Sequence, residues 1–201
     1  QWRVEDGGNG HWYHGMRMPE AITWEEARQA AESAGGHLAT LTSSEEDTWT
    51  ESNIKDALNL DSIEAGPWLG GRRLEPGASW NWITGEPWSF TNWCPGEPGG
   101  SDLSLHYWRE ATDCWNDSFD TDVHFTYIVE WSADCNDDGI VDYGQILDGT
   151  LNDANANGVP DVCEEVQWRT EDGGNGHWYA LVRSEGGLLW EEAREAALEA
   201  G

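Results

Sequence analysis

The segment from Phe125 to Trp131 alternates between polar and apolar side chains, a pattern that predicts a β-strand with one buried face. Shorter apolar runs bounded by turn-forming residues predict further strands at 11–13, 37–41, 68–71, 79–82, 103–108 and 113–116. A long irregular stretch, from Gly85 to Asp102, separates two of these strands.

Two helices are predicted ahead of most of the strands. Thr23 and Glu26 have the spacing of a capping box, an Ala-rich segment runs on to Ala34, and Gly35-Gly36 ends it. Ser44 opens a second helix that we expect to extend toward Leu60. Helices followed by several strands and a long loop indicate an α+β fold.

The charge of the chain excludes two classes of partner. Its 201 residues include 39 acidic and 10 basic side chains, a formal net charge of −29. Nucleic acid and anionic membranes would be repelled, whereas bound divalent cations would offset part of the self-repulsion. No apolar run is long enough to cross a bilayer, so we expect no membrane insertion.

The four cysteines indicate disulfides. None of them has Cys-x-x-Cys spacing, so neither a zinc ribbon nor a redox motif is indicated. Pairing Cys94 with Cys114 would join the two strand ends around the irregular stretch, and pairing Cys135 with Cys163 would close a separate acidic segment. The sequence alone does not fix the connectivity. Both pairings imply a secreted or cell-surface protein, with any export signal outside this segment.

The chain repeats its own beginning. Residues 1–35 align without a gap to residues 167–201, at an offset of 166, with 22 identities over the 35 positions. This periodicity predicts a slice of a tandem array, in which the last segment is the truncated start of another unit. We therefore expect three parts: a domain at 1–133, a linker at 134–165 and a partial repeat at 166–201.

Oxygen-bearing side chains follow the two central cysteines. Glu97-Pro98 lies on a Gly- and Pro-rich loop after Cys94, and Asn116-Asp117 comes soon after Cys114. Carboxylate and amide oxygens suit Ca²⁺, whereas Zn²⁺ or Cu²⁺ would favour His or Cys. The sequence therefore predicts a calcium site that contains Glu97, Asn116 and Asp117.

The acidic linker has the spacing of a calcium-binding loop twice. Each copy places Asp or Asn at positions 1, 3, 5 and 9 of an EF-hand-type loop, Gly at position 6 and a backbone carbonyl ligand at position 7. The expected ligands of the first copy are Asp134, Asn136, Asp138, Ile140 and Asp142. Those of the second copy are Asp153, Asn155, Asn157, Val159 and Asp161, with Glu164 at position 12. The first copy has Gln145 at position 12, which predicts weaker binding. The pair resembles dockerin or thrombospondin type 3 calcium repeats.

Residues 9–131 resemble the C-type lectin-like domain. The resemblance rests on an ordered set of motifs: Trp24 to Ala27, Gly36 to Ala39, Glu45-Glu46, Trp68 to Gly71, Trp80-x-Trp82 with Gly85, Asn92-Trp93, Gly96 to Pro98, Trp115 to Asp117 and Tyr127 to Trp131. It implies a compact fold whose first and last strands pair, and a long loop carrying a calcium site. In that family Glu97, Asn116 and Asp117 would be side-chain ligands, the Glu97–Pro98 bond would be cis, and a sugar would complete the calcium shell with two hydroxyls.

Two departures from the family pattern affect this site. Gly99 stands where sugar-binding members carry Asn or Asp, and it has no side-chain oxygen to offer. The loop is short, so we take Asp102 as the substitute for the usual next acidic ligand. Trp80, Trp82, Trp93 and Trp115 fall on family core positions, whereas Trp88 and Trp108 are free of that constraint and are candidates for stacking on a ligand.

These observations favour a non-enzymatic extracellular protein that carries Ca²⁺. The leading hypothesis is an adhesin or fibre made of lectin-like domains on calcium-stiffened connectors, with neighbouring copies or repeats as partners. The alternative is a calcium-dependent carbohydrate-binding module that uses Glu97, Asp102, Asn116 and Asp117 to bind glycans. An enzyme of the formylglycine-generating type, which shares this fold, would need a reactive Cys pair that the sequence lacks, and no Ser-His-Asp set is discernible.

Overall fold

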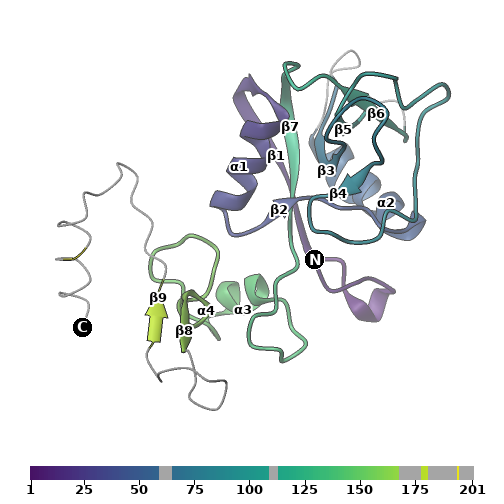
Figure 1. The fold of residues 1–201 in the computed structure, drawn as a ribbon. Coiled ribbons are helices and arrows are strands. Elements are labelled where there is room, and N and C mark those ends of the chain that lie inside the picture. The colour runs from purple at the N-terminus through teal and green to yellow at the C-terminus, as the bar shows by residue number, and fades with distance from the viewer. Residues whose placement is uncertain (59–64, 109–112, 168–177, 181–193, 195–201) are drawn as a thin grey trace. The chain divides into compact units, whose positions relative to one another are not determined.

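The computed structural model describes residues 1–58, 65–108, 113–167, 178–180 and 194. These residues fall into two compact units, Gln1–Pro160 and Asp161–Gly201. Figure 1 shows the elements of both units. The helices are α1 (Trp24–Ser33), α2 (Ser44–Thr50), α3 (Asp142–Asp148) and α4 (Asp161–Glu164), with single turns η1 (Val4–Asp6), η2 (Glu51–Lys55) and η3 (Asp56–Leu58). The strands are β1 (Trp12–Ile22), β2 (His37–Leu38), β3 (Trp68–Arg72), β4 (Asn81–Trp82), β5 (Ser104–Tyr107), β6 (Trp115–Ser118), β7 (His124–Trp131), β8 (Glu165–Gln167) and β9 (Trp178–Ala180).

The first unit is built on one mixed sheet. Its strands follow the order β1-β7-β3-β5-β6, with β2 paired to β7 and β4 paired to β3. Strands β1 and β7 are antiparallel, and Trp12 lies opposite Trp131. The chain therefore enters and leaves the domain side by side, as the resemblance to the lectin-like fold implied.

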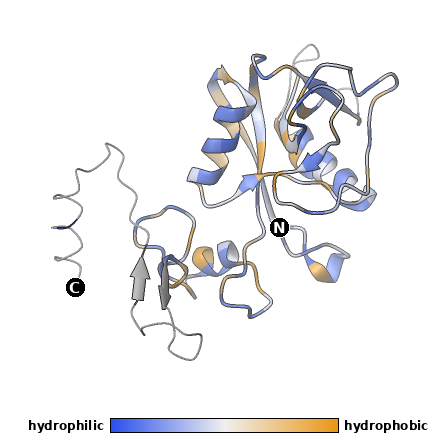
Figure 2. Ribbon diagram, viewed as in Figure 1, coloured by the Kyte–Doolittle hydropathy of each residue, from blue (hydrophilic) through white to orange (hydrophobic). Residues whose placement is uncertain are grey.

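Helix α1 begins where its cap residues predicted. Thr23 Oγ1 accepts a hydrogen bond from the backbone N–H of Glu26, and the Glu26 side chain accepts one from the backbone N–H of Thr23. Trp24, Ala27 and Ala31 lie on one face and are buried. Hydrophilic residues dominate the remaining surface of α1 (Figure 2), so the helix covers the sheet with a narrow apolar stripe.

Helix α2 is shorter than we predicted. Ser43 caps its start, but the helix gives way at Glu51 to a wider π turn and then to a 3₁₀ turn that ends at Leu58. The π turn places Lys55 inside the domain, 1 % exposed, with Nζ 3.5 Å from Oε1 of Glu51 and 5.6 Å from the ring centroid of Tyr107.

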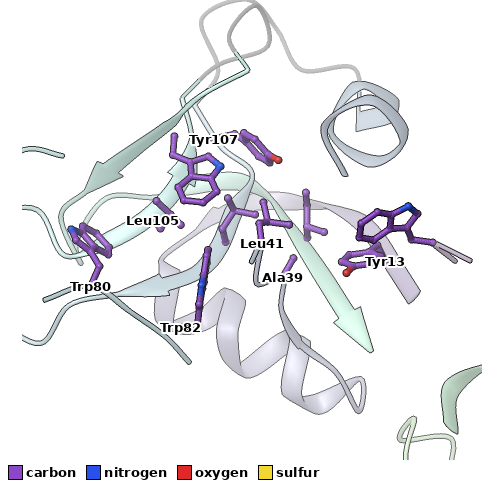
Figure 3. Close-up of a cluster of buried hydrophobic side chains, with 11 residues drawn as sticks. Tyr13, Ala39, Leu41, Trp80, Trp82, Leu105 and Tyr107 are labelled. Atoms are coloured by element: carbon purple, nitrogen blue, oxygen red, sulfur yellow. The ribbon is translucent and has the colours of Figure 1, made fainter. Parts of the chain in front are cut away.

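Aromatic rings fill much of the core. Figure 3 shows one cluster, in which Ala39, Leu41 and Leu105 lie between Trp80 on one side and Tyr13 on the other. Trp80, Trp82 and Trp115 are buried, and Trp93 packs against them, as predicted.

Trp88 is also part of this core. Its ring lies 4.4 Å from the ring of Trp82 and 5.9 Å from that of Trp80. Trp88 is thus partly buried against core tryptophans, and stacking of a ligand on the rest of its ring stays a prediction.

The linker that follows β7 packs on the domain at two places. Tyr143 of α3 lies edge-on to Trp12, with ring centroids 5.9 Å apart. Gly158, with φ of 82°, lies so close to the end of α1 that a Cβ atom there would be 2.1 Å from the carbonyl oxygen of Ala34. Residues 134–160 thus form one compact unit with residues 1–133.

In the second unit, β8 and β9 form an antiparallel pair. Strand β9 begins at Trp178, which the 166-residue offset matches to Trp12, the first residue of β1. Most of the predicted partial repeat lies outside the described residues.

Candidate metal centres

Three of the predicted ligands of the lectin-type site converge on Gly99. The position that a Cβ atom would take at Gly99 lies 3.4 Å from Oδ2 of Asp102, 3.5 Å from Oδ1 of Asp117 and 3.5 Å from Oε2 of Glu97. The Glu97–Pro98 peptide bond is cis. These distances are ordinary van der Waals contacts, so a small side chain at position 99 would also fit among the three carboxylates.

The cation among these groups is a side chain, Arg73, which follows β3. Its Nη2 lies 3.2 Å from Oδ2 of Asp117 and donates to the carbonyl oxygen of Gly99, and its Nε donates to the carbonyl oxygen of Asp102 at 2.6 Å. The guanidinium is 5.1 Å from the ring centroid of Trp80. The sequence analysis missed Arg73, although an Arg in so acidic a chain is a signal that could have been followed.

Asp117 is the buried member of the carboxylate set. Burial raises the pKa of its carboxyl group to about 6, and the negative charges of Asp102 and Glu97 add to this rise. The hydrogen bond from Gly99 N–H, at 2.7 Å, lowers the pKa. Arg73 opposes this rise. The site therefore holds more negative charge than Arg73 alone offsets.

Arg73 already contacts oxygens that a calcium ion would use at this loop. Ca²⁺ binds oxygens at 2.3–2.6 Å, so its ligand oxygens lie within about 5 Å of one another. Among the described residues, neither Glu97, Asp102 and Asp117 nor the linker aspartates Asp134, Asp138 and Asp142 form a group whose ligand atoms all lie within 4.8 Å, so this spacing does not distinguish the two sites. Arg73 also contacts one oxygen of Asp117, and the loop N–H contacts the other.

The structure places the other two predicted ligand-binding residues away from this cluster. The amide nitrogen of Asn116 lies 3.3 Å from Nε2 of His106 and donates to the carbonyl oxygen of Asp117. Because side chains alternate along a strand, Asn116 faces the opposite side of β6 from Asp117. Trp108 follows β5 at the end of the β5–β6 ladder where Tyr107 pairs with Trp115. Its backbone N–H donates to the carbonyl oxygen of Cys114 at 3.1 Å.

The disulfide between Cys94 and Cys114 is present, with Cα atoms 4.9 Å apart. It ties the start of the 94–102 loop to the strand that carries Asp117. Cys135 and Cys163 are also disulfide-bonded, and no cysteine of the chain is free.

The first linker loop has the backbone of a cation-binding turn. Asp134 accepts from the N–H groups of Asp138 and Gly139, at 3.1 and 2.8 Å, and Asn136 Oδ1 accepts from the N–H of Asp138 at 3.0 Å. Asp138 Oδ1 in turn accepts from the N–H of Ile140 at 2.9 Å. Positions 1, 3 and 5 of the loop therefore all point their oxygens inward.

The second loop reproduces this pattern. Asp153 accepts from the N–H groups of Asn157 and Gly158, at 3.1 and 2.9 Å, Asn155 Oδ1 accepts from the N–H of Asn157, and Asn157 Oδ1 accepts from the N–H of Val159. Position 4 is left-handed in both loops, with φ of 57° and 56°, and so is the glycine at position 6, with φ of 85° and 82°. The remaining predicted ligands, Asp161 and Glu164, lie in α4 at the start of the second unit.

Two buried oxygens of the first loop lack a partner. Oδ1 of Asp142 and Oε1 of Gln145, at loop positions 9 and 12, accept no hydrogen bond, and these residues are 3 % and 5 % exposed. Gln145 Nε2 donates to Oδ2 of Asp138 at 2.7 Å, so its amide reaches into the loop. Burial raises the pKa of Asp142, and the charges of Asp134 and Asp138 add to this rise against the Cys135 N–H bond. An unpartnered carboxylate oxygen beside two like charges fits a bound cation.

A third acidic group, which the sequence analysis did not assign, is already satisfied by protein groups. Glu46 and Glu130 are buried, and Tyr13 donates to both, at 2.6 and 3.2 Å. His11 Nδ1 lies 2.6 Å from Oε1 of Glu130. Burial disfavours the charged form of His11, but the hydrogen bond and the charge of Glu130 raise the pKa of the imidazole overall. This network joins α2, β1 and β7.

Comparison with known proteins assigns the family. Residues 20–128, just over half of the chain, match the Lectin C-type domain, and the chain belongs to that family. The chain is 33% identical over 111 residues to a Type-2 ice-structuring protein of Brachyopsis segaliensis, covering 52% of this chain and 60% of that protein. It is 28% identical over 102 residues to a Perlucin-like protein of Mytilus galloprovincialis, covering 49% and 64% respectively. The chain thus spans less than two thirds of the length of these relatives.

Solved structures share the fold. The C-type carbohydrate-recognition domain of cow CD23, solved in the presence of a GlcNAc2Man3 oligosaccharide, is 25% identical with a TM-score of 0.52, covering 63% of this chain and 91% of that chain. A calcium-independent type II antifreeze protein is 24% identical with a TM-score of 0.52, covering 62% and 88%. Within the part of the chain that the structure describes, every helix is too short or too polar to span a membrane.

Proposed function

We propose that this chain is a secreted, non-catalytic module that binds Ca²⁺ through its linker, and that the ion stiffens the connection between successive lectin-like domains. The disulfide-bonded cysteines support an oxidising, extracellular location. The unpartnered oxygens of Asp142 and Gln145 are the single observation that carries the proposal.

Calcium at the first loop would be held by Asp134, Asn136, Asp138, the carbonyl of Ile140 and Asp142, with Gln145 completing the set. The protein's own contribution is a backbone already folded into the required turn, because its N–H groups hold the ligand side chains in place. The ion would supply the positive charge that these carboxylates lack. The second loop, with the same backbone, would bind in the same way.

The experiment compares two neighbouring aspartates. Asp138→Asn removes a charge at ligand position 5, and Asp137→Asn removes the same charge at position 4, where the family of loops uses no side-chain ligand. Isothermal titration of Ca²⁺ should show weakened binding for the first variant and near-unchanged binding for the second. Equal affinities for both variants and the unaltered chain would contradict the proposal.

We further propose that the array formed by such units acts as an adhesive or fibre-like structure, with other repeats or copies of this protein as partners. The gapless offset of 166 residues and the packing of the linker on the domain support it. A two-repeat chain should shorten and stiffen when Ca²⁺ is added, which small-angle X-ray scattering would measure. An unchanged scattering profile with and without chelator would argue against a calcium-stiffened array.

A second candidate function is calcium-dependent glycan binding at the lectin-type loop. The relative solved with an oligosaccharide and the convergence of Glu97, Asp102 and Asp117 favour it. It would require Arg73 to leave Asp117 and the side chain of Asn116 to turn toward the carboxylates, so that together they could hold Ca²⁺. A glycan array probed with and without chelator tests this candidate, and the absence of any chelator-sensitive glycan would remove it.

A further inference from the structure

We propose that the guanidinium of Arg73 is the resident cation of the lectin-type loop, and that this loop is held in its folded form without Ca²⁺. Calcium binding by this chain would then occur at the linker. The lectin-type loop would expose no bound ion, because Arg73 holds its shape.

The contacts of Arg73 support this assignment. One guanidinium reaches three parts of the loop region: the carboxylate of Asp117, the carbonyl of Gly99 and the carbonyl of Asp102. These are a side-chain oxygen and two backbone oxygens from two segments of the chain, the kind of oxygen set that a bound calcium ion would otherwise gather. The planar fork of Arg allows one side chain to serve several oxygens at once.

Burial makes this cation a fixed part of the fold. Arg73 is 5 % exposed, Asp117 is 2 % exposed, and the guanidinium lies over Trp80 at 5.1 Å. A buried charge of this kind is stable only with its partners in place. Displacing Arg73 from the loop would break its hydrogen bonds and leave a buried positive charge without a partner.

A calcium ion and Arg73 would compete for the same oxygens. An ion ligated by Asp117 would share that carboxylate with Nη2, which is 3.2 Å from Oδ2, and two cations at such short range repel each other. The other oxygen of Asp117 already accepts the Gly99 N–H at 2.7 Å. Gly99 itself contributes no side-chain ligand. While Arg73 is in place, the Asp117 carboxylate and the carbonyl oxygens of Gly99 and Asp102 are therefore already bound to a cation.

Arg72 provides a matched control for Arg73. It is the adjacent residue and carries the same charge, but its Nη2 pairs with Asp120 at 2.8 Å and its guanidinium lies 4.6 Å from the ring centroid of Trp24. Arg72→Gln and Arg73→Gln therefore each remove one guanidinium that pairs with an aspartate. Only the second removes the cation of the loop.

The experiment uses the full chain with Asp134→Asn and Asp153→Asn, which remove position 1 from both linker loops. We expect no calcium binding to this background by isothermal titration at millimolar Ca²⁺. Arg73→Gln in the same background should lower the melting temperature in calcium-free buffer more than Arg72→Gln does, and added Ca²⁺ should restore part of that loss only in the Arg73 variant.

Two outcomes would overturn the proposal. One is a calcium site that remains in the linker-disabled background and disappears on Asp117→Asn. The other is equal melting of the Arg72 and Arg73 variants. Should Arg73→Gln not fold, Arg73→Lys replaces it, because lysine keeps the charge but lacks the planar guanidinium. This variant should melt at a lower temperature than the background and still bind no Ca²⁺. An unchanged melting temperature would count against the proposal. Failure of the unaltered chain to bind Ca²⁺ would contradict the linker sites and agree with the role of Arg73.

Discussion

The ring of Tyr143 stacks on the ring of Trp131, with centroids 4.0 Å apart and planes inclined by 9°. Trp131 is the last residue of β7, and Tyr143 belongs to α3, the helix that also carries positions 9 and 12 of the first linker loop. The loop is thus closed at one end by the domain's last strand and at the other by a helix that returns to that strand. A conformational change in the loop would therefore alter the stacking of Tyr143 on Trp131.

Tyr143→Ala should loosen the linker from the domain. Stacking with Trp131 and the edge contact with Trp12 would both be lost, and we expect the variant to be destabilised by about 1–3 kcal/mol. Urea unfolding followed by Trp fluorescence would measure this, since both partner residues are tryptophans. Tyr143→Phe keeps the ring and serves as the control; a loss as large as that of the Ala variant would contradict a role for stacking.

Gly158→Ala should be more harmful than Gly139→Ala. The two glycines occupy position 6 of their loops, with φ of 82° and 85°, so both substitutions carry the same backbone strain of about 1–2 kcal/mol. A Cβ atom at Gly139 has nothing within 4 Å, whereas one at Gly158 would lie 2.1 Å from Ala34 O. The Gly158 variant should therefore melt several degrees lower than its counterpart. Identical melting temperatures would show that the second loop does not pack on α1 in solution.

Removal of calcium should destabilise the chain. Extracellular loops of this type bind at roughly 0.1–1 mM, so about 10 mM Ca²⁺ would stabilise the folded state by about 1.4–2.7 kcal/mol for each occupied loop. Differential scanning calorimetry in excess chelator should show a correspondingly lower melting temperature. Mg²⁺ at the same concentration controls for ionic strength, and an equal effect of both ions would point to screening of the −29 charge instead of specific sites.

Two buried histidines should lower the stability of the domain as the pH falls, whereas the raised pKa values of His11, Asp117 and Asp142 act in the opposite direction. Burial lowers the pKa of His106 to about 4 and that of His124 to about 2, and for His124 the neighbouring His106 adds to the effect. Nδ1 of His106 faces the carbonyl oxygen of Tyr107 at 2.6 Å, and a carbonyl only accepts, so this nitrogen carries the proton of the neutral ring.

The sign of the pH dependence follows from these lowered values. The unfolded chain takes up protons on both imidazoles below pH 6.5, whereas the folded chain does not until about pH 4. The contribution of these two histidines to the free energy of unfolding is therefore fully present above pH 6.5 and is lost as the pH falls. Each histidine contributes a slope of about 1.4 kcal/mol per pH unit. Urea unfolding between pH 7 and pH 5 measures this slope. His124→Phe, which keeps a ring against Trp68, should reduce it; an unchanged slope would contradict the assignment.

Local signals in the sequence predicted the elements that depend on local contacts. The capping box of Thr23 and Glu26 fixed the start of α1, and the spacing of Asp and Asn around Gly139 and Gly158 predicted two turns that the structure forms with identical hydrogen bonds. The family of the domain followed from the ordered motifs and is confirmed. The calcium assignments themselves remain predictions.

What the sequence did not reveal depends on contacts between distant residues. Arg73 meets Asp117 across 44 positions, and Ala34 meets Gly158 across an even longer separation, so no periodicity or spacing points to either contact. Asn116 was expected beside Asp117 because the two are neighbours in the chain, yet alternation along β6 turns them to opposite faces. Trp88 lacked a pattern that would have marked it as core.

The pairing of Trp12 with Trp131 has a mechanical consequence. A load applied to the two ends of the domain would act across β1 and β7, peeling their hydrogen bonds apart one pair at a time instead of shearing them all together. Tyr143 contacts both residues of that first pair, so any such tear would have to begin by pulling this tyrosine away. The resistance of the domain to stretching would therefore depend less on its core than on the contacts of Tyr143 with Trp12 and Trp131.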